Sequence, residues 1–188
     1  RRPFVADPGT RFAYDNGAAN LAALALANAV GQPLSTYARQ RLLAPLGIQR
    51  FAWRQGALGR ELGALGLSLT TRGMARIGEL VLSEGQWAGR ALLPAAFVRD
   101  ATRRQSAGGY PVGQPYGYLW WVVDGGRGRQ GARPATMASG YGGQWIYVEP
   151  ALQAVVAVTS RRTPESAARG QSLTLIRRDI LPALQRLR

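Results

Sequence analysis

Apolar positions in the first hundred residues recur at helical spacing in separate stretches. This spacing predicts four helices, at residues 18–30, 36–43, 72–83 and 94–103. Good cap residues precede three of them: Asp15 and Asn16, then Ser35, then Thr70 or Thr71. Between the second and third helices, residues 51–69 are rich in glycine and predict irregular structure with one short strand at 51–53.

The pattern changes after residue 107, where aromatic and β-branched residues dominate. It predicts three strands, at residues 116–123, within 136–148 and at 154–159. Residues 149–152 are typical of a hairpin connection between the last two strands. Apolar positions in residues 171–187 then predict a closing amphipathic helix.

Helices followed by an antiparallel meander and a final helix favour the α+β class over a doubly wound sheet. We expect residues 1–188 to be part of one domain, with 1–106 mostly helical and 107–188 holding the strands and the closing helix. The longest apolar run, residues 21–30, is too short to span a bilayer, so no membrane span is expected in this segment.

Composition excludes much chemistry. The net charge is +14, all 24 basic residues are arginine, and the chain has no lysine, histidine or cysteine. This excludes a Ser-His-Asp triad, ordinary zinc, haem and iron–sulfur sites, a P-loop, a Schiff base and a disulfide framework. We therefore expect no metal and no organic cofactor. The arginines are scattered singly or in pairs, so a nucleic-acid-binding domain is only a weaker alternative.

Three short segments resemble functional motifs but lack a residue or the context that the motif needs. Residues 126–131 fit G-x-G-x-x-G, but the context of a dinucleotide site is missing and a hairpin loop is expected. Ser166 and Arg169 imitate Ser-x-x-Lys, but an arginine stays protonated and cannot act as a base. Ser68 lies in no nucleophile elbow, because its G-x-S-x-G pattern is incomplete.

Two segments carry candidate chemistry. In residues 8–16, Tyr14 and Asn16 form a Tyr-x-Asn at a helix start, which suits a cleft edge. The same residues also suit a buried aromatic followed by a helix cap. In residues 138–144, Ala138, Ser139 and Gly140 open a glycine-rich strand that permits close approach of a ligand, or merely a bulge.

Taken in order, six segments resemble the serine β-lactamase-like superfamily, which includes class C β-lactamases, penicillin-binding proteins, esterases and nylon-oligomer hydrolases. They span about residues 8–160: PGTRFAYDN (8–16), APLGI (44–48), GLSLTTRGMARIGEL (66–80), WAGRALLP (87–94), YGYLWW (116–121) and ASGYGGQWIYVEPALQAVVAVTS (138–160). The resemblance implies an antiparallel sheet flanked by helices plus a helical subdomain, of which this chain would be the C-terminal portion.

The resemblance also implies roles for the candidate residues. Tyr14 would be the general base or proton shuttle, and Asn16 would orient the substrate or a lysine. Residues 138–140 would be the third motif of the family and line the substrate, and the backbone N–H of Tyr141 would be an oxyanion-hole donor. Ala138 stands where β-lactamases carry a lysine. An esterase, amidase or peptidase acting on a small ester, amide or peptide is therefore favoured over antibiotic resistance.

The family's Ser-x-x-Lys, which precedes Tyr-x-Asn, is absent. The chain also begins without methionine, so we expect residues to precede it. The favoured interpretation is part of a serine hydrolase that forms its acyl-enzyme on a serine outside this chain. A non-catalytic fragment or pseudoenzyme that binds a peptide, a cell-wall fragment or a partner protein is the alternative. Localisation, periplasmic or secreted against cytoplasmic, and oligomeric state stay open.

Overall fold

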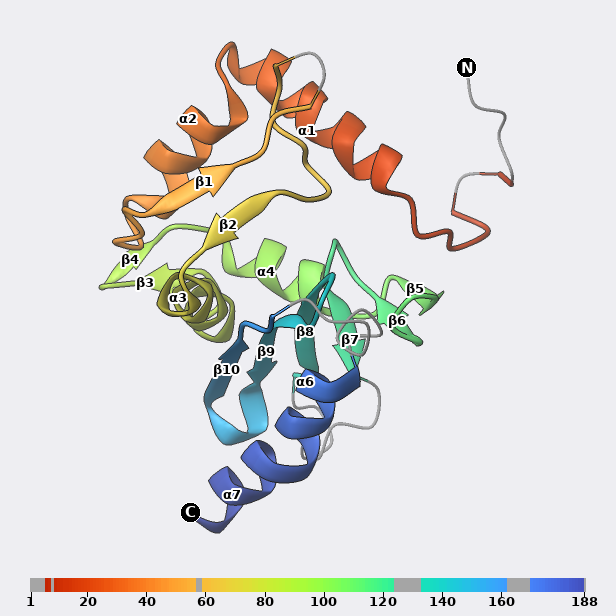
Figure 1. Cartoon of the computed structure of the whole chain (residues 1–188), viewed down its shortest axis with the longest axis vertical. Helices are drawn as coiled ribbons and strands as arrows, with labels where there is room; N and C mark the ends of the chain where they lie inside the picture. Colours follow the sequence, from red (N-terminus) through yellow and green to blue (C-terminus); the bar gives the residue numbers. More distant parts are fainter. Residues whose placement is uncertain (1–5, 8, 57–58, 124–132, 162–169, 188) are drawn as a thin grey trace.

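The computed structural model describes residues 6–7, 9–56, 59–123, 133–161 and 170–187. A central antiparallel sheet has helices on both faces, and a mainly helical region stands at one end (Figure 1). The expected α+β class and the antiparallel sheet flanked by helices are confirmed. The hairpin loop expected at 126–131 and the residues Ser166 and Arg169 lie outside the described residues.

Each strand of the six-stranded main sheet pairs with the next strand along the chain, so the order across the sheet is β10-β9-β8-β7-β6-β5. Their bounds are β5 Ser106–Gly109, β6 Gln114–Tyr116, β7 Trp121–Val123, β8 Ala135–Gly140, β9 Gln144–Glu149 and β10 Ala154–Val158. The turn between β9 and β10 is a short 3-10 helix, η2 (Pro150–Leu152), as the expected hairpin connection requires.

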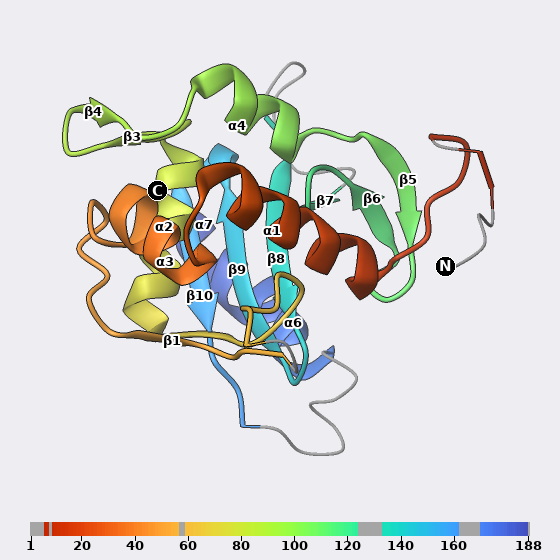
Figure 2. The ribbon, with the colours of Figure 1, turned by 90° about the horizontal axis from the view of Figure 1, so that it is seen from above.

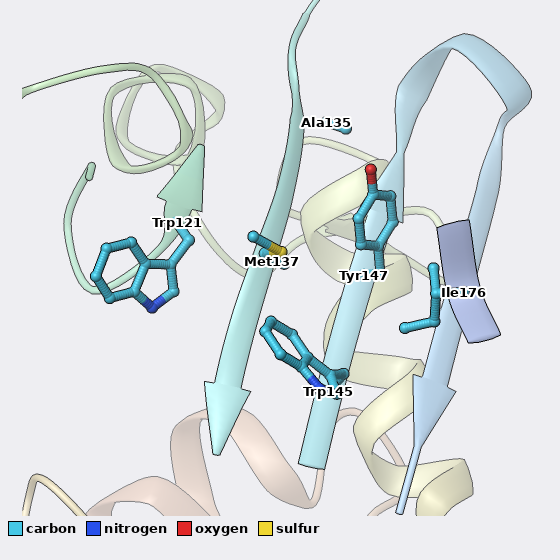
Figure 3. Packing of buried hydrophobic residues seen from close by; sticks show 6 residues of the cluster. All are labelled: Trp121, Ala135, Met137, Trp145, Tyr147 and Ile176. Carbon is cyan, nitrogen blue, oxygen red and sulfur yellow. The ribbon is translucent and has the colours of Figure 1, made fainter. Parts of the chain in front are cut away.

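Alternating side chains of this sheet enter two separate cores. On one face, called the α6 face here, Trp121, Met137, Trp145 and Tyr147 pack under Ile176 (Figure 3). Three consecutive helical segments cover that face: α6 (Gly170–Leu175), the π-helical η3 (Ile176–Ile180) and α7 (Leu181–Arg186). They form the closing helix that the sequence predicts.

The opposite face, called the α3 face here, packs against two helices, α3 (Thr71–Leu82) and α4 (Ala95–Thr102). Val81 of α3 and Val98 of α4 meet Ile146 and Val148 of β9. Thr70 caps α3, since its hydroxyl accepts from the Gly73 N–H at 3.0 Å. Pro94 precedes α4 as its N-cap residue.

The helical region is built from α1 (Asn16–Val30), α2 (Leu34–Ala38) and the π-helical η1 (Arg39–Leu43). Asp15 caps α1 by accepting from the Gly17 N–H at 2.7 Å, and Gly31 ends it in the left-handed conformation with φ 66°. Figure 1 shows α1 at the end of the molecule away from α7. Seen from above, in Figure 2, its ribbon crosses the line of sight to β8 and β9.

Two small hairpins and one edge strand go beyond what the sequence predicted, apart from the expected short strand β1. They are the hairpin of β1 (Phe51–Trp53) with β2 (Leu67–Leu69), the small hairpin of β3 (Gln86–Trp87) with β4 (Arg90–Ala91), and the edge strand β5. Of these strands, β1 matches the short strand expected at 51–53, and the others were not predicted. The other strands are two to four residues long and carry little alternation, so their pairing depends on tertiary contacts.

Two local predictions were wrong. The expected strand at 116–123 is interrupted after Tyr116, because Gly117 and Tyr118 turn away and Leu119 takes a positive φ of 62°. Ser35 does not cap the second helix, which begins at Leu34 after Pro33. The Ser35 hydroxyl instead donates to the Glu61 carboxylate, at 2.5 Å.

Candidate functional site

Tyr14 lies in the extended segment that leads into α1. Its ring stacks on the Trp121 indole of β7, with centroids 5.8 Å apart and planes 19° apart. It also meets Tyr116 of β6 edge-on at 6.3 Å. The side chain keeps 38% of its surface exposed, so the ring is anchored without being enclosed.

Phe12 explains why the segment takes this path. In an extended chain, residues two apart point to the same side, so Phe12 and Tyr14 face the sheet together. The Phe12 ring lies 5.1 Å from Tyr116 and 6.0 Å from Trp121. Four aromatic rings therefore form one cluster on the β6–β7 pair, and this cluster attaches the segment before α1 to the main sheet.

Asn16 is the first residue of α1 and is exposed. Of the two expected cap residues, Asp15 makes the capping bond, which frees the Asn16 amide from that role. The Tyr-x-Asn spacing thus has a structural basis: the first residue is held by the sheet and the third opens the helix. The alternative interpretation, a buried aromatic followed by a helix cap, is correct for the cap at Asp15, but Tyr14 is only partly buried.

Residues 138–140, the family's third motif, were expected to open a strand, but they are the last three residues of β8. Ala138 points to the α3 face, where it packs with Ile146 and Val148. Ser139 alternates to the α6 face, the face of Met137 two residues earlier. Met137 pairs with Trp121 in the β7–β8 register, and both side chains lie on the α6 face. Tyr14, which stacks on Trp121, and Ser139 therefore lie on the same face of the sheet.

Two enclosed polar atoms at this strand end have no hydrogen-bond partner in the described structure. They are the Ser139 hydroxyl oxygen and the Trp145 indole nitrogen, whose residues face each other across β8 and β9. Enclosed polar groups without partners are uncommon, and each costs free energy. This end of the sheet is therefore incompletely satisfied in the described chain.

Tyr141 follows β8 in the turn to β9, and 55% of its side chain is exposed. Gly142 and Gly143 complete the turn with φ 81° and 83°. Such positive φ angles are strained for residues with a Cβ, so the glycines permit a tight turn here. Gly140 pairs with Gln144 and closes it.

Within the aromatic cluster, burial changes the pKa of Tyr116. It raises the pKa of Tyr116 to about 12, and the nearby Tyr14 charge adds to this effect. Tyr116 therefore stays neutral and protonated across the physiological range. Its phenol cannot serve as a proton acceptor there.

The structure also has a hollow of about 610 Å³ at the other end of β8, lined by residues around the C-terminus of α3 and the η2 turn. Arg133 lines it and donates to the Val81 and Leu82 carbonyl oxygens, both at 2.9 Å, and to Glu84 at 3.2 Å. Glu84 also pairs with Arg99 at 2.6 Å. None of the predicted site residues lines this hollow.

Within the described ranges, no group of three acidic, histidine or cysteine side chains is placed to hold a metal ion. No helix in the same ranges has the length and apolar character to cross a membrane.

The sequence placed Tyr116 and Trp121 only in an expected strand, and their contact with Tyr14 was not predicted. The role of Gln144, which holds the turn that carries Tyr141, was not predicted either. The signal available for Gln144 was its position directly after the glycine pair 142–143.

Comparison with known proteins identifies the family. The family model named Beta-lactamase matches residues 1–178. The chain belongs to the Beta-lactamase family. This confirms the resemblance drawn from the sequence. A search of curated proteins found no match.

Solved structures of this family share the fold. A protein assigned as a 6-aminohexanoate-dimer hydrolase from Bacillus anthracis matches with a TM-score of 0.78 and 23% identity, over 97% of this chain and 46% of that chain. An octameric penicillin-binding protein homologue from Pyrococcus abyssi matches with 0.70 and 19%, over 92% and 44%. A β-lactamase/D-alanine carboxypeptidase from Yersinia pestis matches with 0.64 and 19%, over 94% and 56%. This chain thus spans about half the length of these proteins.

Proposed function

We propose that this chain is part of a serine hydrolase that forms its acyl-enzyme on a serine outside residues 1–188. Membership of the Beta-lactamase family supports a hydrolase of this type. The observation that carries the proposal is the placement of Tyr14. Its ring is fixed by stacking on Trp121, yet part of it stays exposed immediately before Asn16 and α1.

The reaction assigns each residue a step. The oxygen of the serine attacks the carbonyl carbon of an ester or amide, and Tyr14 takes the serine proton and passes it to the leaving oxygen or nitrogen. The Tyr141 N–H donates to the negative oxygen of the tetrahedral intermediate. Water then attacks the acyl-enzyme, releases the acid and restores the serine. Asn16 orients the groups around Tyr14.

A tyrosine titrates near 10 in water and becomes a base at neutral pH only beside a cation. In the proposed site this cation is the lysine of Ser-x-x-Lys, and because the chain has no lysine, it must come from the segment that carries the serine. The neutral Tyr116, with its pKa of about 12, is not a substitute for Tyr14 in this role.

The exposed apolar surface of α1 supports the proposal that another segment of the protein covers this helix. Although most of its residues are alanine or leucine, none is buried, and Leu21 is 68% exposed. Exposed apolar residues recur on one side of the helix at positions 18, 21, 22, 25 and 29. A contiguous exposed apolar stripe is typical of a surface that another segment covers.

The proposed substrates are uncharged esters, amides or peptides. Ala138 provides no cation at the position where a lysine would bind a substrate carboxylate, and its side chain packs among apolar residues of the α3 face. A substrate without a carboxylate needs no lysine at position 138, so alanine there does not weaken its binding.

Turnover of p-nitrophenyl esters by the full-length gene product tests the proposal. We expect hydrolysis, and a Tyr14→Phe variant should lose about 10²- to 10⁴-fold in kcat, the range for removal of general acid–base catalysis. Tyr118→Phe is the matched control, because Tyr118 is an exposed tyrosine whose ring contact is with Phe97 of α4. Unchanged turnover in Tyr14→Phe would remove Tyr14 from its role.

A non-catalytic binding function is the second candidate, favoured by the absence of any lysine from the chain. It predicts no ester turnover by the full-length gene product, together with saturable binding of a peptide or cell-wall fragment.

A further inference from the structure

The turn between β8 and β9 is held by one side chain, Gln144. Its amide nitrogen donates to the Gly142 carbonyl oxygen at 3.2 Å and to the Ser160 carbonyl oxygen at 2.8 Å. Its amide oxygen accepts from the Ser160 N–H at 3.1 Å. The single amide thus binds the turn itself and both backbone groups of the residue that follows β10.

This pairing continues the sheet beyond its last backbone contact. The β9–β10 register ends at Trp145 with Val158, and the Gln144 amide then occupies the place of the next peptide group opposite Ser160. Gln171 of α6 supports it from the other side by donating to the Ser160 hydroxyl at 3.1 Å. Three elements therefore meet at Ser160.

The turn has no room to shift toward α6. A Cβ on Gly143 would lie 2.8 Å from the Ser172 hydroxyl oxygen and 3.0 Å from the Gln171 amide nitrogen. A Cβ on Gly140 would lie 2.9 Å from the Gln144 Cβ. Close packing on one side and three hydrogen bonds on the other restrain the backbone of residues 140–143.

We infer that Gln144 is a positioning residue that fixes the Tyr141 N–H at the oxyanion. This rests on the proposed function, in which Tyr141 donates to the developing negative charge. A donor contributes to catalysis only when it is already placed where the charge develops. A misplacement of about 1 Å costs roughly 100-fold in rate.

The test uses Gln144→Glu in the full-length gene product. The carboxylate keeps the length and the oxygen that accepts from Ser160, but it cannot donate to the Gly142 and Ser160 carbonyl oxygens. We expect kcat for a p-nitrophenyl ester to fall by roughly 10- to 100-fold with KM little changed, because the oxyanion exists only in the transition state.

A thionoester gives a readout that general loosening of the fold would not move. Sulfur accepts hydrogen bonds poorly, so an oxyanion hole favours the oxygen ester over its thiono analogue. The preference of the wild-type protein should shrink in Gln144→Glu by the same factor as kcat falls. Equal losses on both esters would overturn the assignment.

The control is Gln153→Glu, the same change at the opposite end of the sheet. Gln153 is exposed, and its amide donates to the Pro150 carbonyl oxygen at 2.9 Å. It should leave kcat and the thionoester ratio unchanged. If Gln144→Glu does not fold, Gln171→Ala tests the same set of contacts at Ser160, because Gln171 is exposed and donates to the Ser160 hydroxyl. A smaller fall in kcat is expected for it.

The outcomes separate the two proposals. Hydrolysis that depends on Tyr14 but is indifferent to both Gln144→Glu and Gln171→Ala would refute the positioning role and leave the hydrolase intact. Absence of ester hydrolysis by the wild-type protein would refute the hydrolase, and the role of Gln144 with it.

Discussion

The Tyr14 ring and the Trp121 indole are stacked at 5.8 Å, which joins the segment before α1 to the main sheet. Trp121 is itself almost fully buried and pairs with Met137 of β8. The predicted proton-transfer residue is therefore attached through one buried side chain to the strand that ends in the third motif. The contact holds the Tyr14 ring while 38% of the side chain stays exposed.

Removal of the ring and removal of the hydroxyl should have different consequences at Tyr14. Tyr14→Phe keeps the stack, so its free energy of unfolding should stay within about 0.5 kcal/mol of the wild type. Tyr14→Ala loses the stack and should cost a further ~1 kcal/mol. Urea titrations of the full-length gene product measure both. A Tyr14→Phe variant as unstable as Tyr14→Ala would show that the hydroxyl, and not the stack, anchors the residue.

Stability should fall at high pH because of Tyr116. Its pKa is about 12 in the folded protein, against about 10 in an unfolded chain. The unfolded chain therefore loses the proton first, so stability is fully present below pH 10 and is lost as pH rises toward 12. Burial also raises the pKa of Tyr147, which adds to the same loss.

Tyr116→Phe should remove part of this dependence and leave the part due to Tyr147. The check is the free energy of unfolding measured across that pH range, with the tyrosinate absorbance followed in parallel. An identical alkaline loss in the variant and the wild type would contradict the assignment.

Gly78 marks the closest approach of α3 to the sheet. A Cβ there would clash with Val155 of β10 and lie 2.9 Å from the Ile146 methyl group of β9. Gly78→Ala should therefore destabilise the protein by about 1–3 kcal/mol through overpacking, although alanine is the better helix former. Gly170→Ala is the control, because that glycine of α6 has open space around its Cβ position. Gly78→Ala at wild-type stability would show that α3 can move away from the sheet.

The apolar stripe of α1 gives a test of the partner segment. If Leu21 is covered in the full-length gene product, Leu21→Ala should cost about 2 kcal/mol or more. Leu187→Ala should change stability by less than about 0.5 kcal/mol, because Leu187 is 83% exposed near the chain end. Calorimetric unfolding of the two variants decides it. Equal small effects would mean that α1 faces solvent in the complete protein.

Local signals explain what could be read from the sequence. Asp15, Thr70 and Gly31 set helix ends through contacts within a few residues, so α1 and α3 could be predicted closely. The β-branched and apolar residues within 136–148 and at 154–159 each predicted one strand, and the second prediction matches β10. The first range holds two strands, β8 and β9, because the chain reverses tightly at residues 141–143.

Non-local contacts explain the rest. The turn after Tyr116 forms because Gly117 fits closely against the backbone of α4 and Tyr118 donates to the Ala101 carbonyl oxygen, neither of which the segment itself announces. The stacking of Tyr14 on Trp121 likewise joins residues far apart in the chain. Motif order identified the candidate residues, but only the fold shows which aromatic ring holds Tyr14.

The proposed acyl-enzyme forms on a serine that lies outside this chain. Intact-mass and peptide mass spectrometry of the full-length gene product, quenched during turnover of a p-nitrophenyl ester, test it most directly. We predict a mass gain of one acyl group, located on a serine outside residues 1–188, that accumulates more slowly in Tyr14→Phe. Turnover without any adduct, or an adduct on a residue of this chain, would refute the proposed mechanism.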